Sequence, residues 1–110
     1  MQKAWVYILE CSDGSYYTGS TTNFEDRMQD HHEGKYDGYT AKRRPLKLRW
    51  RYAFSSVWDA IEAERQIKGW SRKKKEALMR GDMKALHTLA QSREMRERRK
   101  KRKNKKEEDT

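Results

Sequence analysis

Residues 5–19 read WVYILECSDGSYYTG, and this stretch decides the fold. Aromatic and β-branched side chains fill residues 5–9 and again residues 16–18, a composition typical of strands. Between them lie Ser-Asp-Gly at residues 12–14, where Gly14 suits the left-handed position of a three-residue hairpin loop. We therefore predict an antiparallel hairpin.

The length of the loop decides which side chains share a face of the hairpin. A two-residue turn would place Tyr7 and Tyr17 on opposite faces. A three-residue loop opposes Cys11 to Ser15, and we predict this register. It puts Tyr7, Tyr17 and Gly19 on one face of the sheet.

A helix and a third strand should follow the hairpin. Asn23 is a candidate N-cap for a helix over residues 24–33, and Gly34 would end it. Residues 36–44 are polar and basic, which indicates a loop or a short irregular helix. Residues 46–54 alternate between apolar and polar, as in a half-buried strand. Its inward side chains would be Leu46, Leu48, Trp50, Tyr52 and Phe54.

Helices are also expected after this strand. One runs from the cap Ser56 to about residue 68, another from about Ser71 to Gly81, and a third begins at Asp82. The apolar side chains of the third are Met83, Leu86, Leu89 and Ala90.

The apolar pattern disappears from residue 93. Residues 98–106 are basic at every position except Asn104. We therefore predict one folded domain over residues 1–90. A highly charged, basic extension over residues 91–110 would be a frayed helix or a disordered tail.

The overall charge indicates an anionic partner. The chain has 27 Lys and Arg against 17 Asp and Glu, a net charge of +10. Nucleic acid is the commonest polyanion, and anionic membrane or ribosomal surfaces are the alternatives. A single cysteine excludes an internal disulfide, and no apolar run suits a signal peptide or a membrane span. We expect a soluble, cytoplasmic protein.

A charged residue interrupts the apolar face of the helix after Ser56. At about 100° per residue, Val57, Ala60 and Ile61 define the inward stripe, and Glu64 falls in its middle. An unpaired buried carboxylate is costly, so a positive group should meet Glu64. A metal ion, an arginine or a structural salt bridge could supply it.

Polar groups also converge on the hairpin. Arg27 and His31 lie along one border of the inward stripe of their helix, at the edge of the core. They lie beside the sheet face that carries the two phenols and Gly19, which has no side chain to keep a phosphate away. The tyrosines could equally be packed core-edge groups. The pattern favours a phosphate site without specifying a reaction.

Taken together, these residues resemble the GIY-YIG nuclease superfamily. The resemblance rests on WVY at residues 5–7, YTG at residues 17–19, Arg27 and His31 on one helix, and Glu64 on another. The segment ERQIKGWSR at residues 64–72 is similar to the small single-domain bacterial branch. The resemblance covers about residues 4–90. Trp5 and Val6 stand where the first tripeptide of the family has Gly and Ile, and Thr18 stands where the second has Ile.

The resemblance implies an α/β (α+β) fold, a three-stranded antiparallel sheet flanked by helices. It also implies an endonuclease that hydrolyses phosphodiester bonds with Mg²⁺, or another divalent cation such as Mn²⁺. DNA is favoured over RNA, in a role such as DNA repair, and no obligate protein partner is evident. By position, the catalytic residues are Tyr7, Tyr17, Arg27, His31 and the metal ligand Glu64.

The resemblance also suggests how the groups would act. Arg27 would stabilise the pentavalent phosphorane. Tyr7, by preference, would take a proton from the attacking water, with Tyr17 positioning; His31 is the alternative base. Contacts to the nucleic-acid backbone would come from Gly19, Lys42, Arg43, Arg44, Lys68 and Arg72.

Two other functions compete with this one. The same scaffold could bind nucleic acid without cutting it, indifferent to Mg²⁺ and to Glu64. A small accessory protein of ribosomes or other RNA assemblies would instead bind through residues 93–106.

Overall fold

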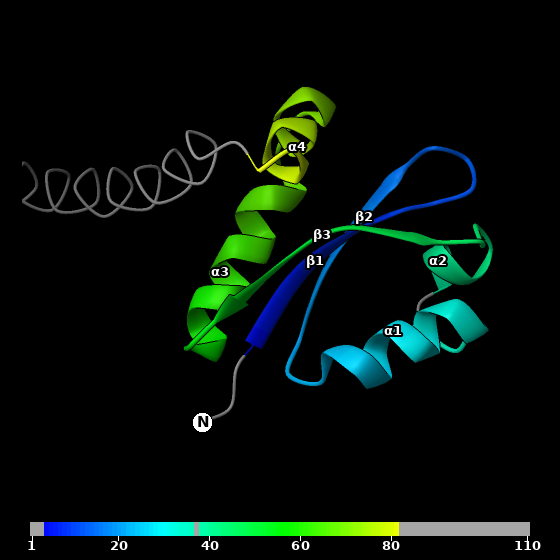
Figure 1. The fold of residues 1–110 in the computed structure, drawn as a ribbon, viewed down its shortest axis with the longest axis horizontal. Helices are drawn as coiled ribbons and strands as arrows, with labels where there is room; N and C mark the ends of the chain where they lie inside the picture. The colour runs from blue at the N-terminus through cyan, green and yellow to red at the C-terminus, as the bar shows by residue number, and fades with distance from the viewer. Residues whose placement is uncertain (1–3, 37, 82–110) are drawn as a thin grey trace, which may run out of the picture. The chain divides into compact units, whose positions relative to one another are not determined.

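Three strands form an antiparallel sheet in the order β2-β1-β3. They are β1 (Ala4–Glu10), β2 (Tyr16–Thr21) and β3 (Lys47–Phe54). The computed structural model describes residues 4–36 and 38–81, and in it the central β1 separates two edge strands (Figure 1). The expected three-stranded antiparallel sheet is confirmed.

The hairpin has the predicted register. Tyr7 lies opposite Gly19, and Leu9 opposite Tyr17. The Cys11 N–H donates to the Ser15 carbonyl at 2.8 Å, which closes the three-residue loop. The two phenols and Gly19 therefore share a face. Because side chains alternate along a strand, Ser20, the next residue of β2, turns its side chain to the opposite face.

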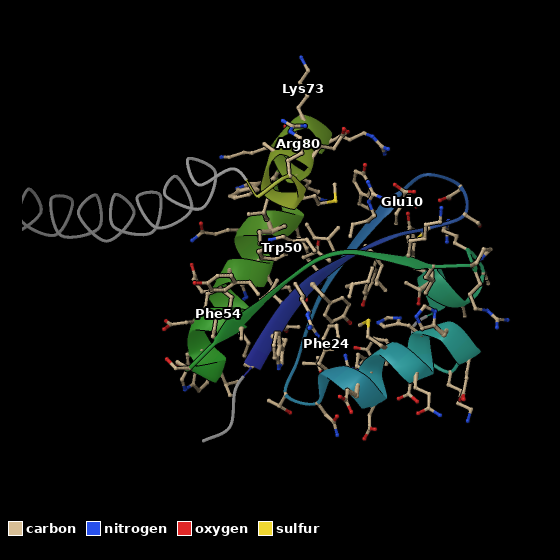
Figure 2. All side chains as sticks on the ribbon, in the orientation of Figure 1. Glu10, Phe24, Trp50, Phe54, Lys73 and Arg80 are labelled. Carbon is tan, nitrogen blue, oxygen red and sulfur yellow. The ribbon has the colours of Figure 1, made fainter. Side chains whose placement is uncertain are left out.

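One face of the sheet is covered by α1 (Phe24–Glu33), with the short α2 (Gly38–Ala41) after it (Figure 1). The Asn23 side chain caps α1, and Gly34 ends it in the left-handed conformation, as predicted. Phe24 packs against the core beneath this helix (Figure 2). That core comprises Tyr7, Leu9, Cys11, Met28 and Leu46.

β3 is a strand, as predicted, but the prediction that its alternate side chains all face inward is wrong. Leu48 is 41% exposed and Tyr52 46% exposed. A register shift between Ile8 and Leu9 of β1 interrupts the pairing with β3, so alternating residues of β3 do not all face the same layer. β3 is also an edge strand, which leaves side chains such as Tyr52 at the margin of the sheet.

The other face of the sheet is covered by α3 (Val57–Lys68), whose N-cap is Ser56, as expected (Figure 1). Its buried side chains are Ala60, Ala63, Gln66 and Ile67. Val57, predicted to face inward, is 38% exposed. The buried stripe is therefore rotated from the predicted one, and Glu64 lies at its border instead of at its centre.

The chain divides into two units after Ser71, and the structure describes residues 72–81 of the second. In the second, α4 (Arg72–Met79) has an ion pair between Arg72 and Glu76 at 3.2 Å. Gly81 follows α4 with a φ of +76°, which agrees with the expected helix end.

Several predictions concern other parts of the chain. The helix expected from Asp82 and the basic extension over residues 91–110 lie outside the described residues, so the division at residue 90 stays a prediction. Within residues 4–36 and 38–81, no helix combines the length and hydropathy that crossing a bilayer requires.

Candidate active site

The candidate site is built around the edge strand β2, at Gly19 and its neighbour Ser20. A Cβ on Gly19 would lie 2.6 Å from Cζ and 3.1 Å from Cε2 of Tyr7. The space above this glycine is therefore filled by the Tyr7 phenol. The sequence suggested that the missing side chain admits a phosphate, but the structure shows that it admits the partner residue across the hairpin.

A buried chain of hydrogen bonds leads away from the Tyr7 hydroxyl. The Tyr7 Oη lies 2.8 Å from His31 Nε2. His31 Nδ1 lies 3.0 Å from Thr40 Oγ1, and Thr40 Oγ1 donates to the Tyr36 carbonyl oxygen at 2.9 Å. Tyr7, His31 and Thr40 are all 0% exposed.

His31 differs from the expectation that it lies at the edge of the core. It is fully buried, because both ring nitrogens have polar partners that replace water. Sequence reasoning missed Thr40, the partner on the far side of the ring. It lies in a polar segment whose pattern shows no periodicity, so the sequence gave no signal that one threonine would be buried.

Aromatic rings enclose the imidazole. Tyr17 meets His31 edge-on with ring centroids 5.4 Å apart, and Tyr36 does so at 4.8 Å. Tyr39 stacks on Tyr17 at 6.3 Å. Tyr17 is partly exposed, in contrast to the buried Tyr7.

Arg27 extends from α1 toward the same strand edge. Its guanidinium carbon lies 3.9 Å from the centroid of the Tyr36 ring, and its Nη1 donates to the Ser20 carbonyl at 3.4 Å. Burial raises the pKa of the Tyr7 phenol well above its ordinary value, while a hydrogen bond from Arg27 and its positive charge offset part of this rise. Electrostatic repulsion from Tyr36 and Glu64 raises the Tyr7 pKa further.

Glu64 reaches Ser20 from α3, on the other face of the sheet. Its Oε2 accepts a hydrogen bond from Ser20 Oγ at 2.6 Å, and its Oε1 pairs with Lys68 Nζ at 2.9 Å. The Glu64 side chain is only 18% exposed. The positive group expected beside this carboxylate is therefore a lysine, as in the salt-bridge alternative.

Ser20 links the two charged groups, although sequence reasoning assigned it no role. Its carbonyl oxygen accepts a hydrogen bond from Arg27, and its hydroxyl donates one to Glu64. Its position directly after the YTG tripeptide is the sole hint in the sequence. The guanidinium and the carboxylate are thus held on one residue of an edge strand.

Glu64 could hold one divalent cation. Among the described residues, no group of three or more His, Cys, Asp or Glu side chains forms a closed metal site. Mg²⁺ does not require one, because it keeps several waters and takes one or two carboxylates together with substrate phosphates. The carboxylate is mostly enclosed, and a cationic group already lies against Oε1. This donor set fits a one-carboxylate site.

Arg43 and Arg44 were expected to contact a phosphate backbone, and the structure gives both a structural role. Arg43 Nε pairs with Asp13 at 3.0 Å, and its guanidinium carbon lies 3.7 Å from the centroid of the Tyr39 ring. Arg44 Nε donates to the Ala41 carbonyl at 3.2 Å.

The remaining predicted contact residues each have different surroundings. Lys42 is exposed, Lys68 is paired with Glu64, and Arg72 is paired with Glu76 in the second unit. The structure thus gathers the catalytic candidates around β2, and of the candidate backbone contacts it brings Gly19 and Lys68 to the same place.

Comparison with known proteins gives a consistent result. Residues 3–77 match the family model described as the GIY-YIG catalytic domain. A UPF0213 protein from Syntrophus aciditrophicus is 47% identical over 81 residues, covering 73% of this chain and 93% of that protein. A UPF0213 protein from Halobacterium salinarum is 47% identical over 73 residues, covering 66% of this chain and 95% of that protein.

A solved structure is also similar. The NMR structure of the protein EF2693 from E. faecalis is 36% identical and has a TM-score of 0.54, covering 74% of this chain and 86% of that chain. The chain therefore belongs to the GIY-YIG catalytic-domain family, and UPF0213 proteins are among its relatives.

Proposed function

We propose that this chain is a metal-dependent endonuclease that hydrolyses phosphodiester bonds of nucleic acid, with DNA as the favoured substrate. The observation that carries the proposal is the meeting of opposite charges at Ser20, where Arg27 and Glu64 bind the same residue. A guanidinium can bind a phosphate, and a carboxylate can hold the cation that phosphate chemistry requires.

Arg27 would stabilise the reacting phosphate. Its planar guanidinium offers paired donors and a charge that does not titrate, which suits the extra negative charge of a pentavalent phosphorane. The Ser20 carbonyl and the Tyr36 ring hold the guanidinium in place. Glu64 would hold Mg²⁺ or Mn²⁺, which when bound supplies Lewis-acid stabilisation of the phosphate and the leaving oxygen.

The exposure of the phenols changes the preferred base. Tyr7 was favoured from the sequence, but Tyr7 and His31 are both 0% exposed, which argues against direct contact with an attacking water. Tyr17 is partly exposed and packs against His31. We therefore assign the proton acceptor to Tyr17, as its phenolate.

The reaction is a hydrolysis. The water oxygen bonds to phosphorus while its proton passes to the Tyr17 oxygen. The ester P–O bond breaks, and the leaving oxygen takes a proton from solvent. Tyr7 and His31 would not touch the substrate and would act only through Tyr17 and Arg27.

Variants test the claim directly. The full chain should cut labelled duplex, flap, single-stranded or RNA substrates with Mg²⁺ and not without it. Glu64→Gln and Arg27→Ala should each lower the rate by at least about 10²-fold. Glu25→Gln, an exposed carboxylate on α1, is the matched control and should cut like the wild type. Equal cutting by all proteins would indicate a contaminating nuclease and overturn the proposal.

One observation favours a second candidate function, nucleic-acid binding without cleavage. Lys68 and Ser20 occupy both oxygens of Glu64, so this carboxylate is satisfied without a metal ion. The net charge of +10 would give salt-sensitive binding in either case. Binding that is unchanged by Mg²⁺ and by Glu64→Gln, with no cutting of any substrate, would establish this function.

A further inference from the structure

We propose that Arg51 binds a phosphate of the nucleic-acid backbone that flanks the phosphate to be cut. The inference rests on the proposed function for the class of ligand, because it takes nucleic acid as the polyanion. Its structural part is that aromatic rings hold the Arg51 guanidinium in place while its hydrogen-bond donors face solvent. A phosphate contact of this kind positions a substrate without reading its sequence.

Two aromatic rings hold the Arg51 guanidinium. Its central carbon lies 5.0 Å from the centroid of the Trp5 ring and 4.8 Å from that of the Phe24 ring. These two rings pack on each other, with centroids 5.5 Å apart. Both distances from the guanidinium are within about 6 Å, the range in which the face of an aromatic ring attracts a cation. Arg51 therefore loses little further side-chain freedom when it binds a ligand.

The ring contacts leave the N–H groups of Arg51 available. A guanidinium stacks on a ring through its flat face, whereas its hydrogen bonds leave from the edge, in the plane of the group. Across residues 4–36 and 38–81, Arg51 forms no salt bridge and donates no hydrogen bond, and its side chain is exposed. A phosphate can therefore meet it in the bidentate geometry that suits arginine.

Arg51 differs in this respect from the other arginines between residues 4 and 71. Most of them already bind an oxygen of the protein: Arg27, Arg43, Arg44 and Arg49. Within the described part of the chain, Arg65 on α3 is also exposed and unpaired, but no aromatic ring holds it. Arg51 is thus both unpaired and held in place, and Arg65 is a control with the same charge.

The register of the sheet places Arg51 across β1 from the candidate active site. Tyr7 lies opposite Gly19 of β2 and opposite Arg51 of β3, so the three residues form one row. The Cα atoms of Gly19 and Arg51 are therefore about 10 Å apart, twice the distance between neighbouring strands. This is about three phosphates along one strand of a duplex, at about 3.4 Å each. A single nucleic-acid strand can reach both Ser20, the residue after Gly19, and Arg51.

Trp5 is a departure from the family pattern that the proposed mechanism does not use. It stands where the first tripeptide of the family has Gly, which offers no ring to a cation. In this chain its ring packs on Phe24 and lies against the guanidinium of Arg51. Trp5 is therefore a positioning residue, because it acts on the ligand through Arg51.

The first test measures binding without cleavage. Labelled duplex DNA is titrated with the full chain in EDTA at several salt concentrations. Arg51→Gln should weaken binding by about 10-fold at low salt, the loss of one charge-assisted hydrogen-bonded contact. It should also reduce the slope of log affinity against log salt by about 0.9, the value for one phosphate. Arg65→Gln removes the same charge and should leave the affinity within about twofold of the wild type.

Further variants separate a phosphate contact from simple packing. Arg51→Lys keeps the charge but lacks the planar fork, so it should keep the salt slope and lose about threefold in affinity. Trp5→Leu should cause a similar loss, and Trp5→Phe, which keeps a ring, should restore most of it. If Arg51 only packs, Arg51→Gln will lower the Tm while its affinity and salt slope match the wild type. That result would overturn the inference, as would equal losses in Arg51→Gln and Arg65→Gln.

Kinetics separate this inference from the proposed function. Arg51→Gln should raise KM by about 10-fold with a much smaller effect on kcat, because the contact forms away from the reacting phosphate. DNA binding that depends on Arg51, in a protein that cuts no substrate, would refute the nuclease and support the phosphate site. Cutting by Arg51→Gln with the KM and the salt slope of the wild type would refute the phosphate site and leave the nuclease intact.

Discussion

The close contact between Gly19 and Tyr7 leads to a prediction about stability. In Gly19→Ala the new Cβ would lie 2.6 Å from Tyr7 Cζ, a separation that real Cβ atoms essentially never show. Tyr7 cannot easily move aside, because it is fully buried and lies 2.8 Å from His31 Nε2. The substitution must therefore distort the core or break that hydrogen bond.

The expected size follows from these two costs. Forcing an extra methyl group into a packed core costs about 1–3 kcal/mol, and a lost buried hydrogen bond adds about 1 kcal/mol. The sum of about 2–4 kcal/mol corresponds to a fall in Tm of at least about 8 °C for a domain of this size. Thermal unfolding followed by circular dichroism measures it.

Gly38→Ala is the matched control, because a Cβ at Gly38 meets no atom within 4 Å. Its Tm should stay within about 2 °C of the wild type, as for a surface substitution. The same small change in Gly19→Ala would refute the reasoning, because it would show that the Tyr7 ring does not fill the space above Gly19. In that case the phosphate assignment for this glycine would regain its basis.

Three further predictions concern single side chains. Burial raises the pKa of Tyr7 in the folded state, so the folded chain keeps the phenol proton at a pH at which the unfolded chain releases it. Wild-type stability should therefore fall as pH rises above about 10. Tyr7→Phe should lose less stability over this range, as measured by Tm against pH. Lys68→Met frees Glu64 Oε1 and should tighten Mn²⁺ binding up to about fivefold by titration calorimetry, since an ion pair whose lysine is exposed contributes up to about 1 kcal/mol. Weaker binding would contradict the metal site. Ser56→Ala removes the acceptor for the Asp59 N–H and should lower the stability by about 1 kcal/mol in urea unfolding, whereas Ser56→Asp should retain it.

The hairpin could be predicted in detail from the sequence. Loop length fixes which residues oppose each other, so placing Tyr7 opposite Gly19 required only the position of Gly14. The caps of α1 and α3 were also readable, because Asn23 and Ser56 act within one turn of their own chain.

Features that depend on distant partners were less predictable. The exposure of Leu48 follows from a register shift in its neighbour strand, which the alternation of β3 does not reveal. The burial of His31 depends on Thr40, nine residues away in an irregular segment. The cation beside Glu64 is a lysine on the next turn of α3, and the sequence pattern alone could not distinguish it from a metal or an arginine.

The double use of Ser20 has a mechanical consequence. One peptide unit sets the span between the guanidinium above the sheet and the carboxylate below it, so the connecting segments on either side can lengthen or shorten without changing that span. A residue inserted within β2 ahead of Ser20 would instead turn its hydroxyl to the wrong layer and separate the two charges. We therefore expect the spacing inside this strand to tolerate far less variation in length than the surrounding loops.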